Sequence, residues 1–363
     1  MDTDLTEDMA PLVPLPVQPR DVPWPSSDGT WPLGETPRPA QARLAELLAQ
    51  AFAPSTPMGQ TYAVVVVHGG VIVAERYGGA LEHWDGPSEP VGATTQLLSW
   101  SMAKSVLHAA VGLLVGEQRL DLDSPAPVPE WQDDADPRHE IRLQDLLEMR
   151  DGLAWREDYV DGNASDVISM LFGPDSADMA AFASSRPLLH KTGSVFNYSS
   201  GTSNIVAGVL RRAVGAGAEL RSFLADRLWS RVGAGPVRIG LDDAGTWVAS
   251  SYCYATARDY GRFGQLYLRD GVWDGERILP AGWVDHGRTP RSVDPDDGEL
   301  YGAHWWIGND EWGTFRASGY EGQSITVCPG LDLVVVRLGK TPAEQADVLA
   351  RWRQEVVEAF AVA

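Results

Sequence analysis

The chain has 363 residues, 44% hydrophobic and 22% charged, which is an ordinary composition for a folded protein of one large domain or two smaller ones. Its net charge of -21 repels phosphate backbones and argues against nucleic acid as a partner. No apolar run approaches the roughly 18 residues of a membrane-spanning helix. The acidic N-terminal sequence lacks the features of a signal peptide. We therefore expect a cytoplasmic protein with no membrane partner.

The chain begins with a segment that has no regular period. Residues 1–40 are rich in proline and acidic residues, which predicts an extended leader. Trp24 and Trp31 lie within it, and large aromatic side chains are costly to leave in water, which favours packing of the leader onto the rest of the chain. An amphipathic helix is predicted next, over 41–52.

Strands are predicted near both ends of the chain and helices between them. A helix from about 96 to 116 is apolar almost all round, which indicates deep burial. Two hairpins are predicted, 61–67 with 71–77 across His-Gly-Gly and 323–328 with 331–338 across Pro-Gly. Further helices are predicted over 141–149, 177–184, 202–214, 256–269 and 342–361.

Both hairpins are satisfied most simply by one antiparallel sheet. The expected fold is therefore of α+β type, an antiparallel sheet flanked by helices with an inserted, mostly helical lobe. The sheet domain would be discontinuous, from 41–95 and 240–363, and the helical domain would span 96–239. A cleft between the two is where a site is expected.

Ser101 and Lys104 open the apolar helix, three residues apart and therefore on one face. No acidic residue lies within reach along this helix, and an unpaired buried ammonium has a lowered pKa. A neutral lysine beside a serine is a competent general base, and the helix N-terminus presents N–H groups to an oxyanion. The alternative is a chance match with the lysine reaching solvent. The apolar surroundings favour catalysis. His108, one turn further on, is predicted to be a structural core histidine.

Tyr198 is the third candidate. It follows a Gly-x-x-Phe-x-Tyr pattern just before the helix at 202–214, where a turn projects a hydroxyl into a cleft. There Tyr198 would relay a proton to the leaving group, whereas the structural alternative is simple packing.

The order Ser101-x-x-Lys104, then Tyr198-Ser-Ser, then the strand pair after Gly319 resembles class C β-lactamases and DD-peptidases. It is also similar to family VIII carboxylesterases and, most of all, to the 6-aminohexanoate-dimer hydrolases. The resemblance covers roughly 60–340. It implies the β-lactamase/DD-peptidase-like fold and an acyl-serine intermediate, with Ser101 as nucleophile, Lys104 as base and Tyr198 as proton relay.

Further roles are implied only by this resemblance. The backbone N–H groups of Ser101 and Tyr320 match an oxyanion hole. Tyr159 matches a residue on a substrate-binding loop, and Trp306 matches a residue lining the same pocket. Glu321, beside Tyr320, is expected to contact the substrate. Core packing is the alternative for Tyr159 and Trp306.

One motif departs from the β-lactamase pattern. The late Lys-Thr-Gly is replaced by Ala-Ser-Gly at 317–319, without the lysine that would bind a β-lactam carboxylate. A Lys-Thr-Gly does occur at 191–193, but it lies just before Tyr198, and we interpret it as a chance match.

We therefore predict a serine hydrolase that cleaves small esters or amides, a carboxylesterase or amidase. A β-lactamase or DD-peptidase, and a non-catalytic binding module on the same fold, stay as alternatives. No metal-binding or dinucleotide motif occurs, so no metal or other cofactor is expected. The oligomeric state and the natural substrate stay open.

Overall fold

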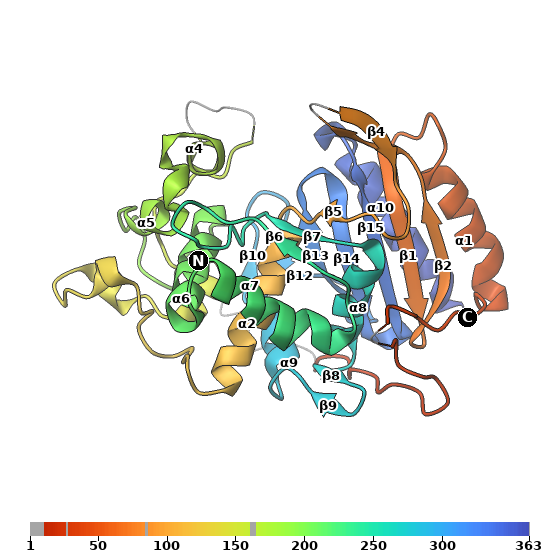
Figure 1. Ribbon diagram of the computed structural model, residues 1–363, viewed down its shortest axis with the longest axis horizontal. Coiled ribbons are helices and arrows are strands. Elements are labelled where there is room, and N and C mark those ends of the chain that lie inside the picture. The colour runs from red at the N-terminus through yellow and green to blue at the C-terminus, as the bar shows by residue number, and fades with distance from the viewer. Residues whose placement is uncertain (1–10, 27, 84–85, 160–164, 363) are drawn as a thin grey trace.

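The computed structural model describes residues 11–26, 28–83, 86–159 and 165–362 and has an eight-stranded antiparallel sheet at its centre (Figure 1). The strand order is β10-β11-β12-β13-β14-β15-β1-β2, so strands from both ends of the chain meet where β15 pairs with β1. These strands are β1 Gln60–His68, β2 Val71–Tyr77, β10 Ser292–Val293, β11 Leu300–Tyr301, β12 Trp306–Ile307, β13 Phe315–Gly319, β14 Gln323–Cys328 and β15 Leu333–Lys340.

Helices cover both faces of this sheet, and the side chains of β1 alternate between them. Val65 and Val67 join the main core on the side of α8, whereas Val64 and Val66 pack toward α1 and α10. This explains why the strand is an unbroken apolar run although the sheet is antiparallel. The helices named here are α1 Arg38–Ala51, α8 Ala257–Leu268 and α10 Ala346–Ala361.

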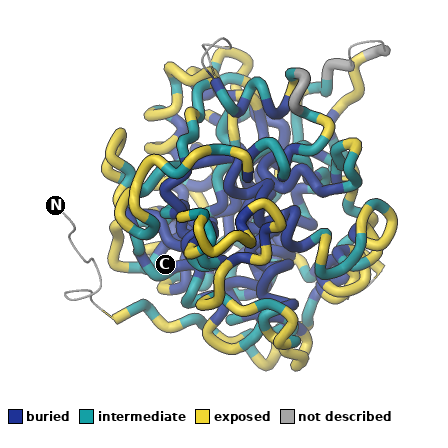
Figure 2. The backbone as a smooth tube through the Cα atoms, turned by 90° about the vertical axis from the view of Figure 1, so that its left-hand side faces the viewer, coloured by how far each residue is buried: buried dark blue, intermediate teal, exposed yellow. Residues whose placement is uncertain are grey.

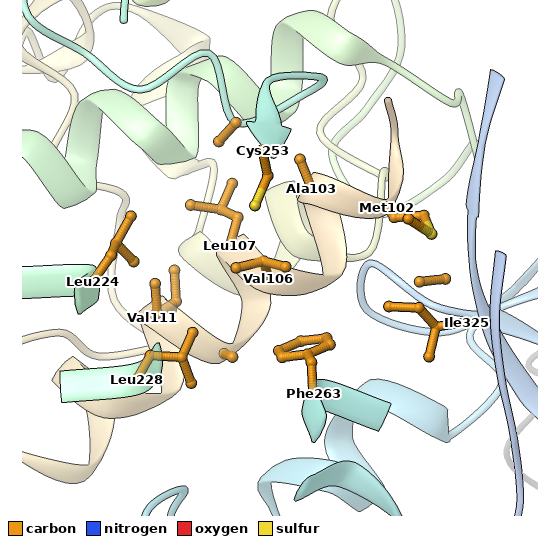
Figure 3. Close-up of a cluster of buried hydrophobic side chains, with 14 of the residues drawn as sticks. Met102, Ala103, Val106, Leu107, Val111, Leu224, Leu228, Cys253, Phe263 and Ile325 are labelled. Carbon is orange, nitrogen blue, oxygen red and sulfur yellow. The ribbon is translucent and has the colours of Figure 1, made fainter. Parts of the chain in front are cut away.

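The helices between the two sheet segments form a lobe beside the sheet, on the left of Figure 1. At its junction with the sheet lies α2, buried along most of its length. Figure 3 shows its apolar side chains between Leu224 and Leu228 on one side and Phe263 and Ile325 on the other. The helices here are α2 Met102–Gly116, α3 Leu143–Leu147, α4 Asp166–Phe172, α5 Met179–Ser184, α6 Ser200–Val214 and α7 Ala218–Leu224; α9 Trp283–Arg288 follows later in the chain.

A small sheet links the two parts of the molecule. Its strands are β5 Leu97–Leu98, β7 Cys253–Ala255 and β6 Arg238–Ile239, paired in that order. The expected domain boundaries near 96 and 240 both fall at this sheet, and we propose it as the junction of two lobes. Two further strand pairs are peripheral: β3 Ala80–His83 with β4 Gly86–Pro90, and β8 Val272–Trp273 with β9 Glu276–Arg277.

The described part of the leader, 11–37, runs over the surface without forming a helix. Trp31 is 3% exposed, and its indole N–H donates to the Gly70 carbonyl at 3.0 Å. Trp24 packs against Trp273 with ring centroids 4.9 Å apart. The leader therefore packs onto the rest of the chain through its tryptophans. In Figure 2 the tube alternates between exposed and intermediate where the described leader begins. Residues 1–10 lie outside the described part.

The predicted start of the long apolar helix, near 96, is wrong. Leu97 and Leu98 pair with β7 instead, and Trp100 has a left-handed φ of 46° that no helix continues through. The helix begins at Met102. Both predicted hairpins are confirmed, although β15 starts at Leu333 because 329–331 form a 3-10 turn.

Among the described residues, none of the helices combines the length and apolar character needed to cross a lipid bilayer.

Candidate active site

Ser101 lies directly before the first residue of α2, and the Lys104 side chain returns to it. Lys104 Nζ donates to Ser101 Oγ at 2.9 Å, to Ser200 Oγ at 3.1 Å and to the Ser250 carbonyl at 3.1 Å. Lys104 is 2% exposed, so the alternative in which it reaches solvent does not hold. The i, i+3 spacing therefore does place the ammonium on the hydroxyl.

Burial determines the charge state of Lys104. Desolvation lowers its pKa from 10.5 to about 8, and the nearby Glu157 carboxylate acts in the opposite direction. All three of its hydrogen-bond partners are neutral oxygens. A substantial neutral fraction near pH 8 is the property that a general base needs.

Glu157 organises the wall beside Lys104, a role that the sequence did not reveal. Its carboxylate accepts from the Ser200 N–H at 2.9 Å and from the Ser200 hydroxyl at 2.6 Å. It also accepts from Trp155 Nε1 at 2.6 Å and from the Tyr159 hydroxyl. Trp155 and Tyr159 lie two residues before and two residues after Glu157, and both donate to its carboxylate, so the three side chains lie on one side of this segment. That spacing is the signal that would have grouped them.

Tyr198 lies beside Ser101 and Lys104, two residues before the start of α6 at Ser200. Lys104 Nζ is 4.8 Å from the centroid of its ring. Burial raises the pKa of Tyr198 above its usual value, Glu157 adds to the rise, and a hydrogen bond with the Ser101 side chain opposes it. The phenol is therefore a proton donor at neutral pH and lies next to the candidate nucleophile.

The end of β13 approaches the start of α2 closely enough to require glycine. A Cβ on Gly319 would lie 2.3 Å from the Ser99 carbonyl oxygen and 3.2 Å from the Ser101 nitrogen. The next residue, Tyr320, therefore enters its turn beside the N-terminus of α2. This is the arrangement that two oxyanion-hole N–H groups would need.

The aromatic residues implied by the resemblance all lie around this centre. Tyr159 packs against Tyr320 with ring centroids 5.3 Å apart and planes tilted by 32°, and both residues are more than 40% exposed. Trp306 packs against Tyr198 with centroids 5.5 Å apart. Tyr301, which the sequence analysis did not single out, contacts both Trp306 and Tyr198.

Glu321 is placed differently from these residues. It has a left-handed φ of 60°, and its carbonyl accepts from Thr341 N at 2.9 Å and from Arg337 Nη1 at 3.2 Å. Its charge acts on Arg337, which is fully buried. These contacts hold the turn after Gly319, and contact of the Glu321 side chain with a substrate stays a prediction.

Three other residues complete the comparison with the sequence. Lys191, in the early Lys-Thr-Gly, is exposed. His108 is buried and hydrogen-bonded to the Tyr267 hydroxyl at 2.8 Å and to His286 at 3.1 Å, so its structural role is confirmed.

His304 was not predicted from the sequence. It is hydrogen-bonded to Ser203 at 3.2 Å, and burial together with the Lys104 charge lowers its pKa to about 3. The described residues contain no cluster of side chains suited to a metal ion.

An antiparallel sheet with a helical lobe, and a serine–lysine pair opening the helix between them, are typical of the fold shared by β-lactamases and penicillin-binding proteins. The chain belongs to the Beta-lactamase family, whose model matches residues 56–359.

Proteins similar to this chain include a named hydrolase and a named carboxylesterase. The 6-aminohexanoate-dimer hydrolase of Paenarthrobacter ureafaciens is 28% identical over 302 residues, which is 78% of this chain and 73% of that protein. A Bacillus anthracis structure provisionally named as such a hydrolase has a TM-score of 0.73 at 23% identity, over 93% of this chain and 88% of its own. A family VIII carboxylesterase has a TM-score of 0.69 at 17% identity, over 89% and 99%. The two structures show the shared fold.

Proposed function

We propose that this protein is a serine hydrolase that cleaves small ester or amide bonds through an acyl-serine intermediate. The observation that carries the proposal is the 2.9 Å contact between Lys104 Nζ and Ser101 Oγ in a buried setting where the pKa of Lys104 falls to about 8. The names of the related hydrolase and carboxylesterase support the same reaction class.

In the proposed mechanism, neutral Lys104 takes the Ser101 proton while Oγ attacks the substrate carbonyl. The resulting oxyanion lies between the backbone N–H groups of Ser101 and Tyr320. As the tetrahedral intermediate collapses, the leaving oxygen or nitrogen takes a proton from Tyr198, which Lys104 replenishes. Water then attacks the acyl-serine by the same route and releases a carboxylic acid.

The aromatic side chains define where a substrate would lie. Tyr159 and Tyr320 pack against each other at an exposed position on one side, and Trp306 with Tyr198 forms a second wall. Flat apolar walls favour acyl or leaving groups with aliphatic or aromatic surface. We do not propose β-lactam hydrolysis, because Ala-Ser-Gly replaces the late Lys-Thr-Gly and Lys191 is exposed on the surface.

The test is steady-state hydrolysis of p-nitrophenyl acetate and butyrate, followed by a panel of small amides, by the wild type and Ser101→Ala. A burst and turnover by the wild type that the folded variant lacks would support the proposal. A chromogenic cephalosporin belongs in the same assay, because faster turnover of it than of the esters would favour the β-lactamase alternative. Equal rates in both proteins would contradict Ser101 as the nucleophile and favour the binding-module alternative.

A further inference from the structure

A second pocket, separate from the Ser101 site, lies between α10 and the sheet. Its volume is about 470 Å³. Arg316 on β13 and Thr326 on β14 form part of its floor and are cross-strand partners. They alternate with Ala317 and Ile325, which pack into the core around α2, so the pocket opens on the other face of these strands.

One face of α10 forms the opposite wall. Ala350, Arg353, Gln354 and Val357 line the pocket, and their i, i+3, i+4, i+7 spacing places them on a single stripe of the helix. Arg353 is therefore directed into the pocket by the helix that carries it. Burial is the main reason why its pKa is lowered to about 9, with further lowering by Arg316.

The guanidinium of Arg353 is not neutralised by the protein. Within the described residues it forms neither a hydrogen bond nor a salt bridge, and Glu299 is the carboxylate that acts on it from a distance. Glu299 is already paired with Arg316. A partly buried guanidinium without a counter-ion is unfavourable.

Two hydroxyl groups in the pocket also lack an oxygen or nitrogen partner among the described residues. Thr326 and Thr314 are 5% and 9% exposed, and the Thr314 hydroxyl interacts with the Cys328 thiol, whose pKa it lowers. Buried hydroxyls are nearly always hydrogen-bonded in folded proteins. Both residues line the same pocket as Arg353, so one ligand would satisfy all three groups.

The acidic residues around the pocket do not supply that ligand. Asp310 Oδ1 accepts from the N–H groups of Trp312 and Thr314 at 3.0 and 3.1 Å. Asp347 is exposed at the rim, one turn of α10 before the exposed Arg351. Inside the pocket, the positive charge of Arg353 is therefore not paired with a carboxylate, and the hydroxyls of Thr314 and Thr326 lie in the same pocket.

We propose that this pocket binds a small oxyanion, a carboxylate or phosphate group, held by Arg353 and by the hydroxyls of Thr314 and Thr326. A planar guanidinium presents two parallel N–H groups to such an anion, and the hydroxyls donate to its remaining oxygens. Binding here involves no residue of the Ser101 centre, so it does not depend on the proposed hydrolysis.

Calorimetric titration of the 363-residue chain with phosphate and with succinate, at low ionic strength, tests the proposal. The variants are Arg353→Gln and Thr326→Val, with Arg119→Gln as the control that removes one positive charge from an exposed ion pair elsewhere. Because neither Arg353 nor the Thr326 hydroxyl has a partner within the described residues, both variants are expected to fold.

We expect the wild type and Arg119→Gln to bind one anion per chain, Arg353→Gln to bind at least about tenfold more weakly, and Thr326→Val about threefold more weakly. Tighter binding of either phosphate or succinate supports the proposal and identifies the anion class. No saturable binding to the wild type up to on the order of 10 mM of either anion, or equal affinity of the wild type and Arg353→Gln, would overturn it.

Discussion

The Glu157 carboxylate holds Ser200 at two points, accepting from its backbone N–H at 2.9 Å and from its hydroxyl at 2.6 Å. Ser200 Oγ in turn accepts from Lys104 Nζ at 3.1 Å. The Ser200 hydroxyl thus links the Glu157 carboxylate to the amino group of Lys104, the candidate base. The negative charge of Glu157 raises the pKa of Lys104, which burial alone would lower further.

Replacing Glu157 with glutamine is expected to move the pH profile of hydrolysis. The base acts when neutral, so the wild-type rate should rise with pH through about 8. Without the Glu157 charge, the pKa of Lys104 falls and the midpoint shifts to lower pH. The maximal rate should fall about tenfold because Ser200 loses a charge-assisted hydrogen bond.

Asp158→Asn is the control, because Glu157 is the carboxylate that acts on Lys104. Equal midpoints of the pH profiles of E157Q and the wild type would refute the effect of Glu157 on the pKa of Lys104.

Lys104→Met separates catalysis from stability. Below pH 8 Lys104 is charged in the folded and unfolded chains, and its desolvation costs roughly 3 kcal/mol, which the three lost hydrogen bonds nearly offset. Urea unfolding at pH 7 should therefore place K104M within about 1 kcal/mol of the wild type. Because the folded-state pKa of Lys104 is lowered, the desolvation cost is lost as the pH rises from 8 to 10.5. Over this range the free energy of unfolding of the wild type should therefore increase relative to that of K104M.

Activity of K104M should fall by on the order of 10³-fold or more. A variant that kept its activity would exclude Lys104 as the base, and one that unfolded at pH 7 would point to a structural lysine.

Tyr198→Phe should lower the rate by about 10²–10⁴-fold, and more for amides than for esters, because an amine leaving group must be protonated to depart. The matched control is Tyr301→Phe, which removes a phenol hydroxyl from a ring that packs against Tyr198. Its rate should stay within about threefold of the wild type. Equal losses of hydrolysis rate in Y198F and Y301F would indicate that Tyr198 and Tyr301 act through packing alone.

Gly319→Ala introduces a methyl group 2.3 Å from the Ser99 carbonyl oxygen and should displace β13 from α2. We expect a loss of about 1–3 kcal/mol in the free energy of unfolding. The rate should fall by about 10²–10³-fold, since the Tyr320 N–H moves away from Ser101. Gly92→Ala is the control, because an added Cβ there meets nothing within 4 Å. A G319A enzyme with an unchanged rate would exclude this oxyanion site.

Features that depend on local periodicity were predictable from the sequence. The strand at 60–68 follows from its run of valines, and contact between Ser101 and Lys104 follows from their spacing on one helix. The paired hairpins follow because β-rich runs flank short turn sequences at both ends of the chain.

Features that depend on distant contacts were not predictable. Glu157 and Ser200 are 43 residues apart, and nothing local indicates that they meet. Trp100 takes a left-handed φ because the chain must turn from β5 into α2, and its sequence carries no glycine to mark that turn. The strands β10, β11 and β12 at one end of the sheet have two residues each, too few to show a period.

The most direct test of the account is intact-mass and peptide-level mass spectrometry after brief exposure to p-nitrophenyl butyrate and acid quench. We predict a single butyryl adduct on Ser101 in the wild type, which accumulates before turnover, and no adduct in Ser101→Ala. An adduct on another residue, or equal labelling of S101A and the wild type, would contradict the assignment of Ser101 as the nucleophile.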